Sequence, residues 1–273
     1  MKMKRTVLIA AMLLAAACTP KEFTFVQMSD TQIGFLDSSE GYIHSDTLMQ
    51  KAVAAVNALK PEVVFITGDL VNSASDTLQE AVFARNLAEI EAPAYLVPGN
   101  HDIRGYSREK HDAYVELRGY DRFAFMKEGC AFIGFDTNCI KDGATEAEEE
   151  QLEWLEEQFR QMKKARFCFV FIHCPIVRED IDEAEDYFNF SKEQRRRYLD
   201  LFKEYGVDAV FAGHTHCQYS TSIDGIGFYT ASAVGNCLKH GIPGFHVVKV
   251  GGKGFEVIFV PTPGVNPESA KHQ

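Results

Sequence analysis

Five short groups of residues in this sequence carry side chains of the kinds that hold divalent metal ions. They combine carboxylates, amides and imidazoles: Asp30 with Gln32, Asp69, Asn100 with His101 and Asp102, His173, and His214 with His216. Oxygen and imidazole ligands suit divalent cations such as Mn²⁺, Mg²⁺, Fe²⁺ and Zn²⁺. Two such ions about 3.5–4 Å apart can stabilise the attacking and leaving oxygens of a displacement at phosphorus, with hydroxide bridging them. The set therefore predicts two-metal hydrolysis of a phosphoester.

The elements around these groups predict that the groups meet in one place. Each group follows a short run rich in β-branched and aromatic residues, and these runs are predicted strands: Phe23–Met28, Val63–Thr67, Ala94–Val97, Phe167–Ile172 and Ala209–Ala212. In α/β sheets, ligands bind beyond the carboxyl ends of the strands. Any one of these polar residues alone could be a turn former or a helix cap. Their joint recurrence at strand ends favours a shared site.

The rest of the chain predicts one α/β domain over residues 23–265 and a tail over 266–273. A further strand is expected at Ala131–Asp136, and an amphipathic helix at Asp46–Leu59. The last strands have no helices between them, which favours antiparallel pairs in a mixed sheet: Gly225–Thr230, Gly244–Val250 and Phe255–Val260.

Two further helices have sequence signals at their ends. Thr145 and Ser191 each begin a capping box, and Gly206 ends the second helix. The run Arg195-Arg196-Arg197 in that helix is interpreted as a solvated face. The acidic segment 179–186 and the aromatic Tyr187 that follows predict either a loop at the mouth of the site or a solvated loop.

The motif series of the chain resembles that of calcineurin-like metallophosphoesterases: Asp30-x-Gln32, Gly68-Asp69-Leu70-Val71-Asn72, Gly99-Asn100-His101-Asp102, His173 and Gly213-His214-x-His216. The likeness covers nearly everything from Phe23 to Val250. Within that family it is greatest to the calcineurin-like phosphoesterase domain-containing protein 1 branch, on segments 29–34, 181–191 and 232–235. The resemblance implies two mixed β-sheets packed as a sandwich and flanked by helices, the four-layer fold of the family.

The resemblance also implies a role for each residue of the series. Asp69 would bridge two metal ions. The other ligands would divide into a first set and a second set: Asp30, Gln32 and His216, then Asn100, His173 and His214. His101 would face the substrate and protonate the leaving group, a task that suits histidine at neutral pH. Asp102 would hydrogen-bond His101 and keep it cationic.

One residue in the first set bears on the choice of metal. Many members of the family carry His where this chain has Gln32, and an amide oxygen is a harder ligand than imidazole. We therefore expect Mn²⁺ or Mg²⁺ in preference to Fe²⁺ or Zn²⁺. Asn72 and His240 are further candidates, as substrate contacts at the rim of the site.

Composition narrows the choice of substrate only in part. The net charge of −11 argues against a nucleic-acid partner. We separately expect a monomer. The named branch is assigned protein-phosphatase activity, which favours a phosphomonoester substrate, small molecule or phosphoprotein. A phosphodiesterase or nucleotide pyrophosphatase is the alternative, because the same two-metal chemistry serves both. A non-catalytic surface-binding lipoprotein is less favoured, since every expected ligand is present.

The N-terminus predicts export. Basic residues precede an apolar run from Val7 to Ala17, as in a signal peptide over residues 1–17 that is too short to remain as a membrane span. The run Ala15-Ala16-Ala17-Cys18 resembles a bacterial lipobox, in which the Cys is acylated and becomes the new N-terminus. Ordinary cleavage after Ala-x-Ala is the alternative. We expect a lipidated tether over residues 18–22 that anchors the protein in a bacterial membrane, facing the periplasm or the cell surface.

Overall fold

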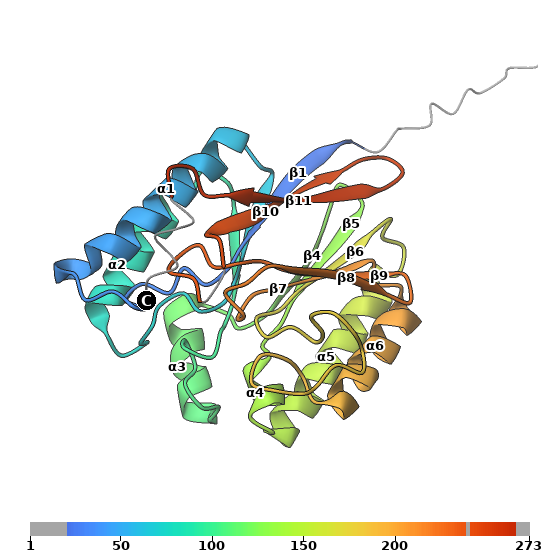
Figure 1. Cartoon of the computed structure of the whole chain (residues 1–273). Coiled ribbons are helices and arrows are strands. Elements are labelled where there is room, and N and C mark those ends of the chain that lie inside the picture. The colour runs from blue at the N-terminus through green and yellow to red at the C-terminus, as the bar shows by residue number, and fades with distance from the viewer. Residues whose placement is uncertain (1–20, 239–240, 266–273) are drawn as a thin grey trace, which may run out of the picture.

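The computed structural model describes residues 21–238 and 241–265, which form two β-sheets and their flanking helices (Figure 1). The first sheet has the strand order β11-β10-β1-β2-β3. Its strands in chain order are β1 (Phe23–Met28), β2 (Val63–Thr67), β3 (Ala94–Val97), β10 (Gly244–Val250) and β11 (Phe255–Pro261). The second sheet has the order β4-β5-β6-β7-β9-β8. Its strands are β4 (Phe123–Lys127), β5 (Cys130–Gly134), β6 (Cys168–Phe171), β7 (Ala209–Ala212), β8 (Tyr219–Ile223) and β9 (Ile226–Thr230).

Both sheets are mixed, as predicted. Strands β1, β2 and β3 run parallel in the first sheet, and β5, β6, β7 and β9 run parallel in the second. Antiparallel pairings lie at one side of the first sheet, where β10 and β11 extend it beyond β1, and at both edges of the second, where β4 and β8 lie. Parallel strands leave their carboxyl ends at one edge, so each sheet presents several strand ends side by side.

An aromatic core joins the two sheets face to face. Along β2, Val63 and Phe65 pack into this core, whereas Val64 and Ile66 face the helices on the other side, as the two-residue period of a strand requires. The rings of Phe65 and Phe171 stack with their centroids 3.8 Å apart and so tie β2 to β6 across the interface. An aromatic pair of this kind contributes about 0.5–1.5 kcal/mol beyond the area that it buries.

Helices cover the two outer faces, which completes the four layers implied by the family resemblance (Figure 1). The first sheet carries α1 (Ile43–Leu59), preceded by the short η1 (Glu40–Tyr42), and α2 (Thr77–Ala88). The second sheet carries α5 (Thr145–Met162) and α6 (Lys192–Tyr205). Two other helices, α3 (Arg108–Arg118) and α4 (Asn138–Lys141), lie in the connections around β4 and β5.

The helix signals in the sequence were mostly correct. Ser191 and Gln194 form the predicted capping box of α6, and Gly206 ends that helix in the left-handed conformation. The capping box predicted at Thr145 was wrong, because Thr145 is already the first residue of α5 and Ala144 precedes it as an N-cap without a side-chain bond. The Glu148 carboxylate instead accepts a hydrogen bond from the Tyr198 hydroxyl on α6.

Several predictions fall on residues outside the described part of the chain: the signal peptide over 1–17, Cys18, His240 and the tail over 266–273. Across the described residues, every helix is too short or too polar to serve as a membrane-spanning segment.

Candidate metal centre

The loops after β1, β2, β6 and β7 bring the predicted carboxylate and imidazole ligands together. These side chains form two groups, and within each group the potential ligand atoms all lie within 4.8 Å of one another. The first group is Asp30, Asp69 and His216, and the second is Asp69, His173 and His214. Asp69 belongs to both groups, which is the position expected of a bridging carboxylate. All the residues in the two groups are buried.

The remaining two predicted ligands are amides with different surroundings. Gln32 is 1% exposed, and neither its Oε1 nor its Nε2 has a hydrogen-bond partner. A buried amide that lacks partners destabilises the folded protein by about 1–3 kcal/mol for each hydrogen bond that is not made. The unpaired Gln32 amide is therefore consistent with a bound metal ion as its partner. The Asn100 Oδ1 atom lies 3.0 Å from Nε2 of His173, beside the second group.

The imidazoles are held in the orientation that metal ligation needs. His173 Nδ1 donates to the Thr67 carbonyl at 2.7 Å, and His216 Nδ1 donates to the Asn236 carbonyl at 2.7 Å. His214 donates instead through Nε2, to the Tyr187 carbonyl at 3.1 Å. In each ring the second nitrogen takes no part in this bond and would bind a cation once it carries no proton, a pattern typical of metal-binding histidines.

Buried negative charge gives a second reason to expect cations. Burial raises the pKa of Asp30. Burial also acts to raise the pKa of Asp69, but the adjacent His173 imidazole holds that pKa well below its usual range. Burial acts to lower the pKa of His173, yet the Asp69 and Asp30 carboxylates raise it to about 10. In the metal-free protein His173 thus supplies positive charge that bound cations would otherwise provide.

The ligand loops have strained backbones. Positive φ angles, which non-glycine residues rarely adopt, occur at five predicted ligands: Asp30 (50°), Gln32 (32°), Asp69 (50°), His214 (70°) and His216 (53°). Backbone strain of this kind is concentrated at functional sites. Close packing of the loops also requires glycine: a Cβ on Gly99 would collide with the backbone nitrogen of Asp69, and one on Gly213 with Oγ of Ser29.

His101 lies at the edge of the two groups, as expected for a residue that faces substrate. Its backbone N–H donates to Asp69 Oδ1 at 2.8 Å, and its Nδ1 donates to the Asn72 carbonyl at 2.9 Å. Asn72, predicted as a rim residue, therefore contacts His101 through its main chain. The side chain of His101 is partly exposed.

The predicted hydrogen bond from His101 to Asp102 was wrong. The Asp102 carboxylate accepts backbone N–H groups from Leu70 at 3.0 Å and Gly99 at 2.8 Å, with a longer contact of 3.4 Å from Val71. Its oxygens are thus taken by main-chain donors, and Asp102 ties the loop after β2 to the loop after β3. Asp102 positions the loops that carry Asp69 and His101, and the imidazole of His101 is held by Asn72 instead.

The segment after the acidic run is part of the site. The Tyr187 hydroxyl accepts a hydrogen bond from Asn100 Nδ2 at 2.9 Å, and its ring lies 4.8 Å from that of His214. The interpretation of Arg195 as solvated was wrong, because Arg195 is fully buried. Its guanidinium donates to carbonyls of the 181–190 loop, those of Ile181, Glu183, Ala184 and Phe190. The only signal in the sequence that this segment contacts the site was the group of aromatic residues that follows the acidic run.

Comparison with known proteins agrees with this geometry. The calcineurin-like phosphoesterase family matches residues 23–218. The chain belongs to the calcineurin-like phosphoesterase family. It is 30% identical over 250 residues to the serine/threonine-protein phosphatase CPPED1 of Danio rerio, covering 84% of this chain and 81% of that protein. This confirms the predicted branch.

Other relatives place the chain within a wide family. A probable glycerophosphodiester phosphodiesterase GpdQ of Arcobacter nitrofigilis is 28% identical over 206 residues, covering 72% of this chain and 73% of that protein. The crystal structure of a dimetal phosphatase from Danio rerio superposes with a TM-score of 0.63 at 14% identity, covering 88% of this chain and 99% of that one. The protein is a metal-dependent phosphoesterase with the fold of this family.

Proposed function

We propose that this protein is a phosphomonoesterase in which Asp69 bridges two cations. The observation that supports the proposal most strongly is the shared position of Asp69 between two buried ligand groups. Asp30, Gln32 and His216 would complete the first cation site, and Asn100, His173 and His214 the second. When bound, the cations would polarise the phosphoryl group and supply a nucleophile from water near neutral pH.

The residues of the chain supply orientation and the proton. Because the Asn72 carbonyl can only accept, Nδ1 of His101 carries a hydrogen, and Nε2 is left to hold the proton that the leaving alkoxide takes. The Asp69 carboxylate fixes the backbone of His101 through the bond to its N–H. Asn100 and Tyr187 are hydrogen-bonded to each other and lie beside His173 and His214 of the second ligand group.

The phosphomonoester assignment is supported by the relatives named serine/threonine-protein phosphatase, and we include phosphoproteins among the candidate substrates. The GpdQ relative supports the alternative, a phosphodiesterase. Gln32 and Asn100 supply amide oxygens, so Mn²⁺ or Mg²⁺ is the proposed metal, with Fe²⁺ or Zn²⁺ as the alternative.

A substrate panel tests both parts of the proposal. The mature chain would be assayed with 4-nitrophenyl phosphate, bis(4-nitrophenyl) phosphate and ADP-ribose, each with Mn²⁺, Mg²⁺, Zn²⁺ or Fe²⁺ added after metal removal. We expect the monoester to be the best substrate and Mn²⁺ or Mg²⁺ to restore the rate. Preference for the diester or for ADP-ribose would favour the alternative reaction, and full activity with zinc alone would refute the metal assignment.

A variant at His101 tests the proton donor. For His101→Ala we expect a loss of about 10²–10⁴-fold with alkyl monoesters, whose leaving groups need a proton, and a much smaller loss with 4-nitrophenyl phosphate. Metal content should stay the same. Equal losses on both substrates would exclude His101 as the general acid.

We also propose that the protein is an exported, monomeric lipoprotein with residues 18–22 as the tether and residues 23–265 as the catalytic domain. Support comes from the basic and apolar residues before Cys18 and from the start of β1 at Phe23, shortly after it. Labelling of bacterial cells with a palmitate analogue should mark the parent protein and leave Cys18→Ser unlabelled. Labelling of both proteins would rule out Cys18 as the acylated residue.

A further inference from the structure

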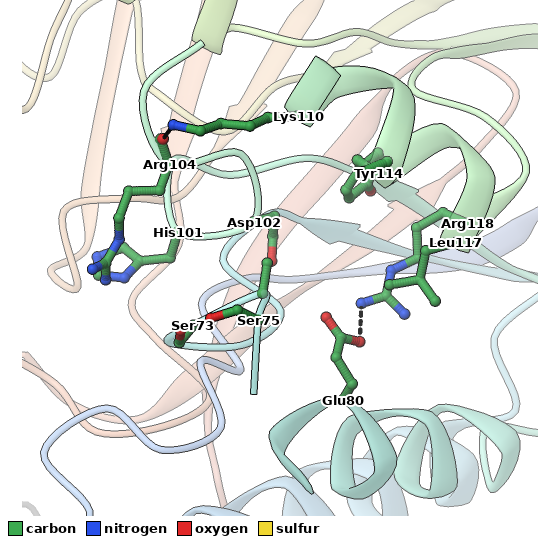
Figure 2. A pocket seen from close by; sticks show the side chains of 12 residues that line it. Ser73, Ser75, Glu80, His101, Asp102, Arg104, Lys110, Tyr114, Leu117 and Arg118 are labelled. Carbon is green, nitrogen blue, oxygen red and sulfur yellow. Dashed lines mark hydrogen bonds and ion pairs between the residues drawn. The ribbon is translucent and has the colours of Figure 1, made fainter. Parts of the chain in front are cut away.

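A cavity of about 400 Å³ opens beside His101 and is called here the α3 pocket. Its wall includes Ser75, His101 and Arg104 from the loops after β2 and β3, and Ala113, Tyr114 and Arg118 from α3. Figure 2 shows His101 and Arg104 at one end of the pocket, and Tyr114, Leu117 and Arg118 at the other. Arg104 and His101 donate to the same carbonyl, that of Asn72. The pocket is thus continuous with the residue that faces substrate.

Two side chains that line the α3 pocket contain buried polar atoms without partners. Tyr114 is 5% exposed and its hydroxyl makes no hydrogen bond, and Nε of Arg118 is likewise unpaired. Arg118 itself is fixed, because its Nη2 lies 2.5 Å from the Glu80 carboxylate. Donors that are left unpaired in a buried position are costly to the folded protein, and an oxygen-bearing ligand in the pocket would supply the partner that these two lack.

The remaining lining defines what kind of group fits. Ala74, Ala113 and Leu117 contribute apolar surface. Three cations, Arg104, Lys110 and Arg118, line the pocket with two carboxylates, Glu80 and Asp102. Glu80 is paired with Arg118, and the Asp102 oxygens are taken by backbone N–H groups. In a protein of net charge −11, this local excess of positive charge is unusual. An apolar body that carries an anionic oxygen matches this combination.

The position of the pocket relates it to one part of the substrate. His101 is the proposed proton donor to the leaving oxygen, so the leaving group must lie on the side of His101. We propose that the α3 pocket binds the leaving alcohol of the substrate and selects an alcohol about the size of an aromatic ring that bears a carboxylate. The inference rests on the proposed phosphomonoesterase function and adds the substrate class to it.

Binding and hydrolysis would be measured separately with matched compounds. Hydrolysis is compared for 4-carboxyphenyl phosphate and phenyl phosphate, and binding of the product 4-hydroxybenzoate is measured by calorimetry. Because a hydrogen bond to a charged group is stronger than one between neutral groups, we expect roughly a tenfold or greater preference in kcat/KM for the carboxylated ester.

Two variants test the assignment to this pocket. Tyr114→Phe removes a buried hydroxyl that has no partner in the unliganded protein, so the variant should fold with an unfolding temperature no lower than that of the parent. It should lose about tenfold in kcat/KM on the carboxylated ester and little on phenyl phosphate.

Ala113→Trp fills the pocket and should abolish binding of 4-hydroxybenzoate. Glu116→Trp, which adds the same ring at an exposed position of α3 outside the pocket, should bind it normally.

The outcomes separate this inference from the proposed function. If phenyl phosphate is hydrolysed without any preference for the carboxylated ester, and 4-hydroxybenzoate does not bind, the proposal for the pocket is overturned while the phosphomonoesterase stands. If neither ester is hydrolysed but 4-hydroxybenzoate binds and Tyr114→Phe weakens it, the pocket is supported and the proposed reaction is not. Equal binding by Ala113→Trp and the parent protein would also overturn the proposal.

Discussion

The two sheets contribute different chemistry to the candidate metal centre. Loops after β1, β2 and β3 of the first sheet carry every candidate oxygen ligand: Asp30, Gln32, Asp69 and Asn100. Loops after β6 and β7 of the second sheet carry every imidazole: His173, His214 and His216. The first sheet thus brings the negative charge that needs compensation, and the second brings ligands that can be neutral. Neither sheet alone holds a complete site.

Removal of the bridging carboxylate from the first sheet should have the largest effect. Asp69→Asn keeps the size of the side chain and tolerates the positive φ angle of 50°. Because both ligand groups share Asp69, we expect loss of both metal ions and a fall in kcat of more than about a hundredfold, since even outer-shell changes cost 10–100-fold. Metal content by emission spectroscopy checks this, with the exposed Asp182→Asn as the control. Retention of two ions would refute the bridging role.

Removal of an imidazole from the second sheet should be milder. His216 belongs only to the first ligand group. For His216→Asn, which also suits a positive φ, we expect one ion in place of two and a loss of about 10–100-fold in rate. Metal stoichiometry by equilibrium dialysis would decide. Simultaneous loss of both ions would show that the two groups are not separable.

The unpaired amide of the first sheet should give opposite effects with and without metal. Gln32→Met keeps the length of the side chain and removes two buried polar atoms that lack partners. We expect the metal-free variant to be more stable than the parent by about 1–3 kcal/mol, and the metal-loaded variant to be less stable. Urea unfolding with and without Mn²⁺ measures both. A shift of the same sign in both conditions would mean that Gln32 does not ligate.

The smallest effect is expected on the loop that overlies the second ligand group. Tyr187→Phe removes one hydrogen bond, from Asn100 Nδ2 to the Tyr187 hydroxyl, and leaves the ring on His214. Because one hydrogen bond contributes about 0.5–1.5 kcal/mol, we expect the affinity for one metal ion to fall a few-fold. A titration of the metal-free variant measures this change. An unchanged affinity would show that Asn100 is held in place without Tyr187.

The sequence was sufficient for most of the strands, because they follow short patterns, but β4 and β8 were not among the strands that it predicted. The structure brings the predicted carboxylates and imidazoles together, and metal ligation by them stays a prediction. Residues Val63 to Ile66 are all apolar, which predicts a strand buried on both faces, and only the structure shows that Val63 and Phe65 meet the other sheet. The partner of Asp102 was not predictable. A carboxylate beside His101 in sequence can point to the imidazole or to neighbouring N–H groups, and only the approach of the loops after β2 and β3 decides between them.

The burial of Arg195 could likewise not be predicted from the sequence. Arg195 lies between two other arginines in α6, and only the path of the 181–190 loop places four carbonyls around its guanidinium. The α3 pocket depends on how α3 packs beside the loop after β3, which no local motif encodes.

The pairing of β10 with β1 has a consequence for how the protein is made. Strand β10 lies between β11 and β1, so the first sheet gains its full width only when the last strands have been synthesised. All the candidate ligands, from Asp30 to His216, precede β10 in the chain. A chain without β10 and β11 would leave β1, the strand that leads to Asp30, unpaired at the edge of the first sheet. The last two strands therefore protect an edge beside the candidate metal centre that would otherwise be open to pairing with another chain.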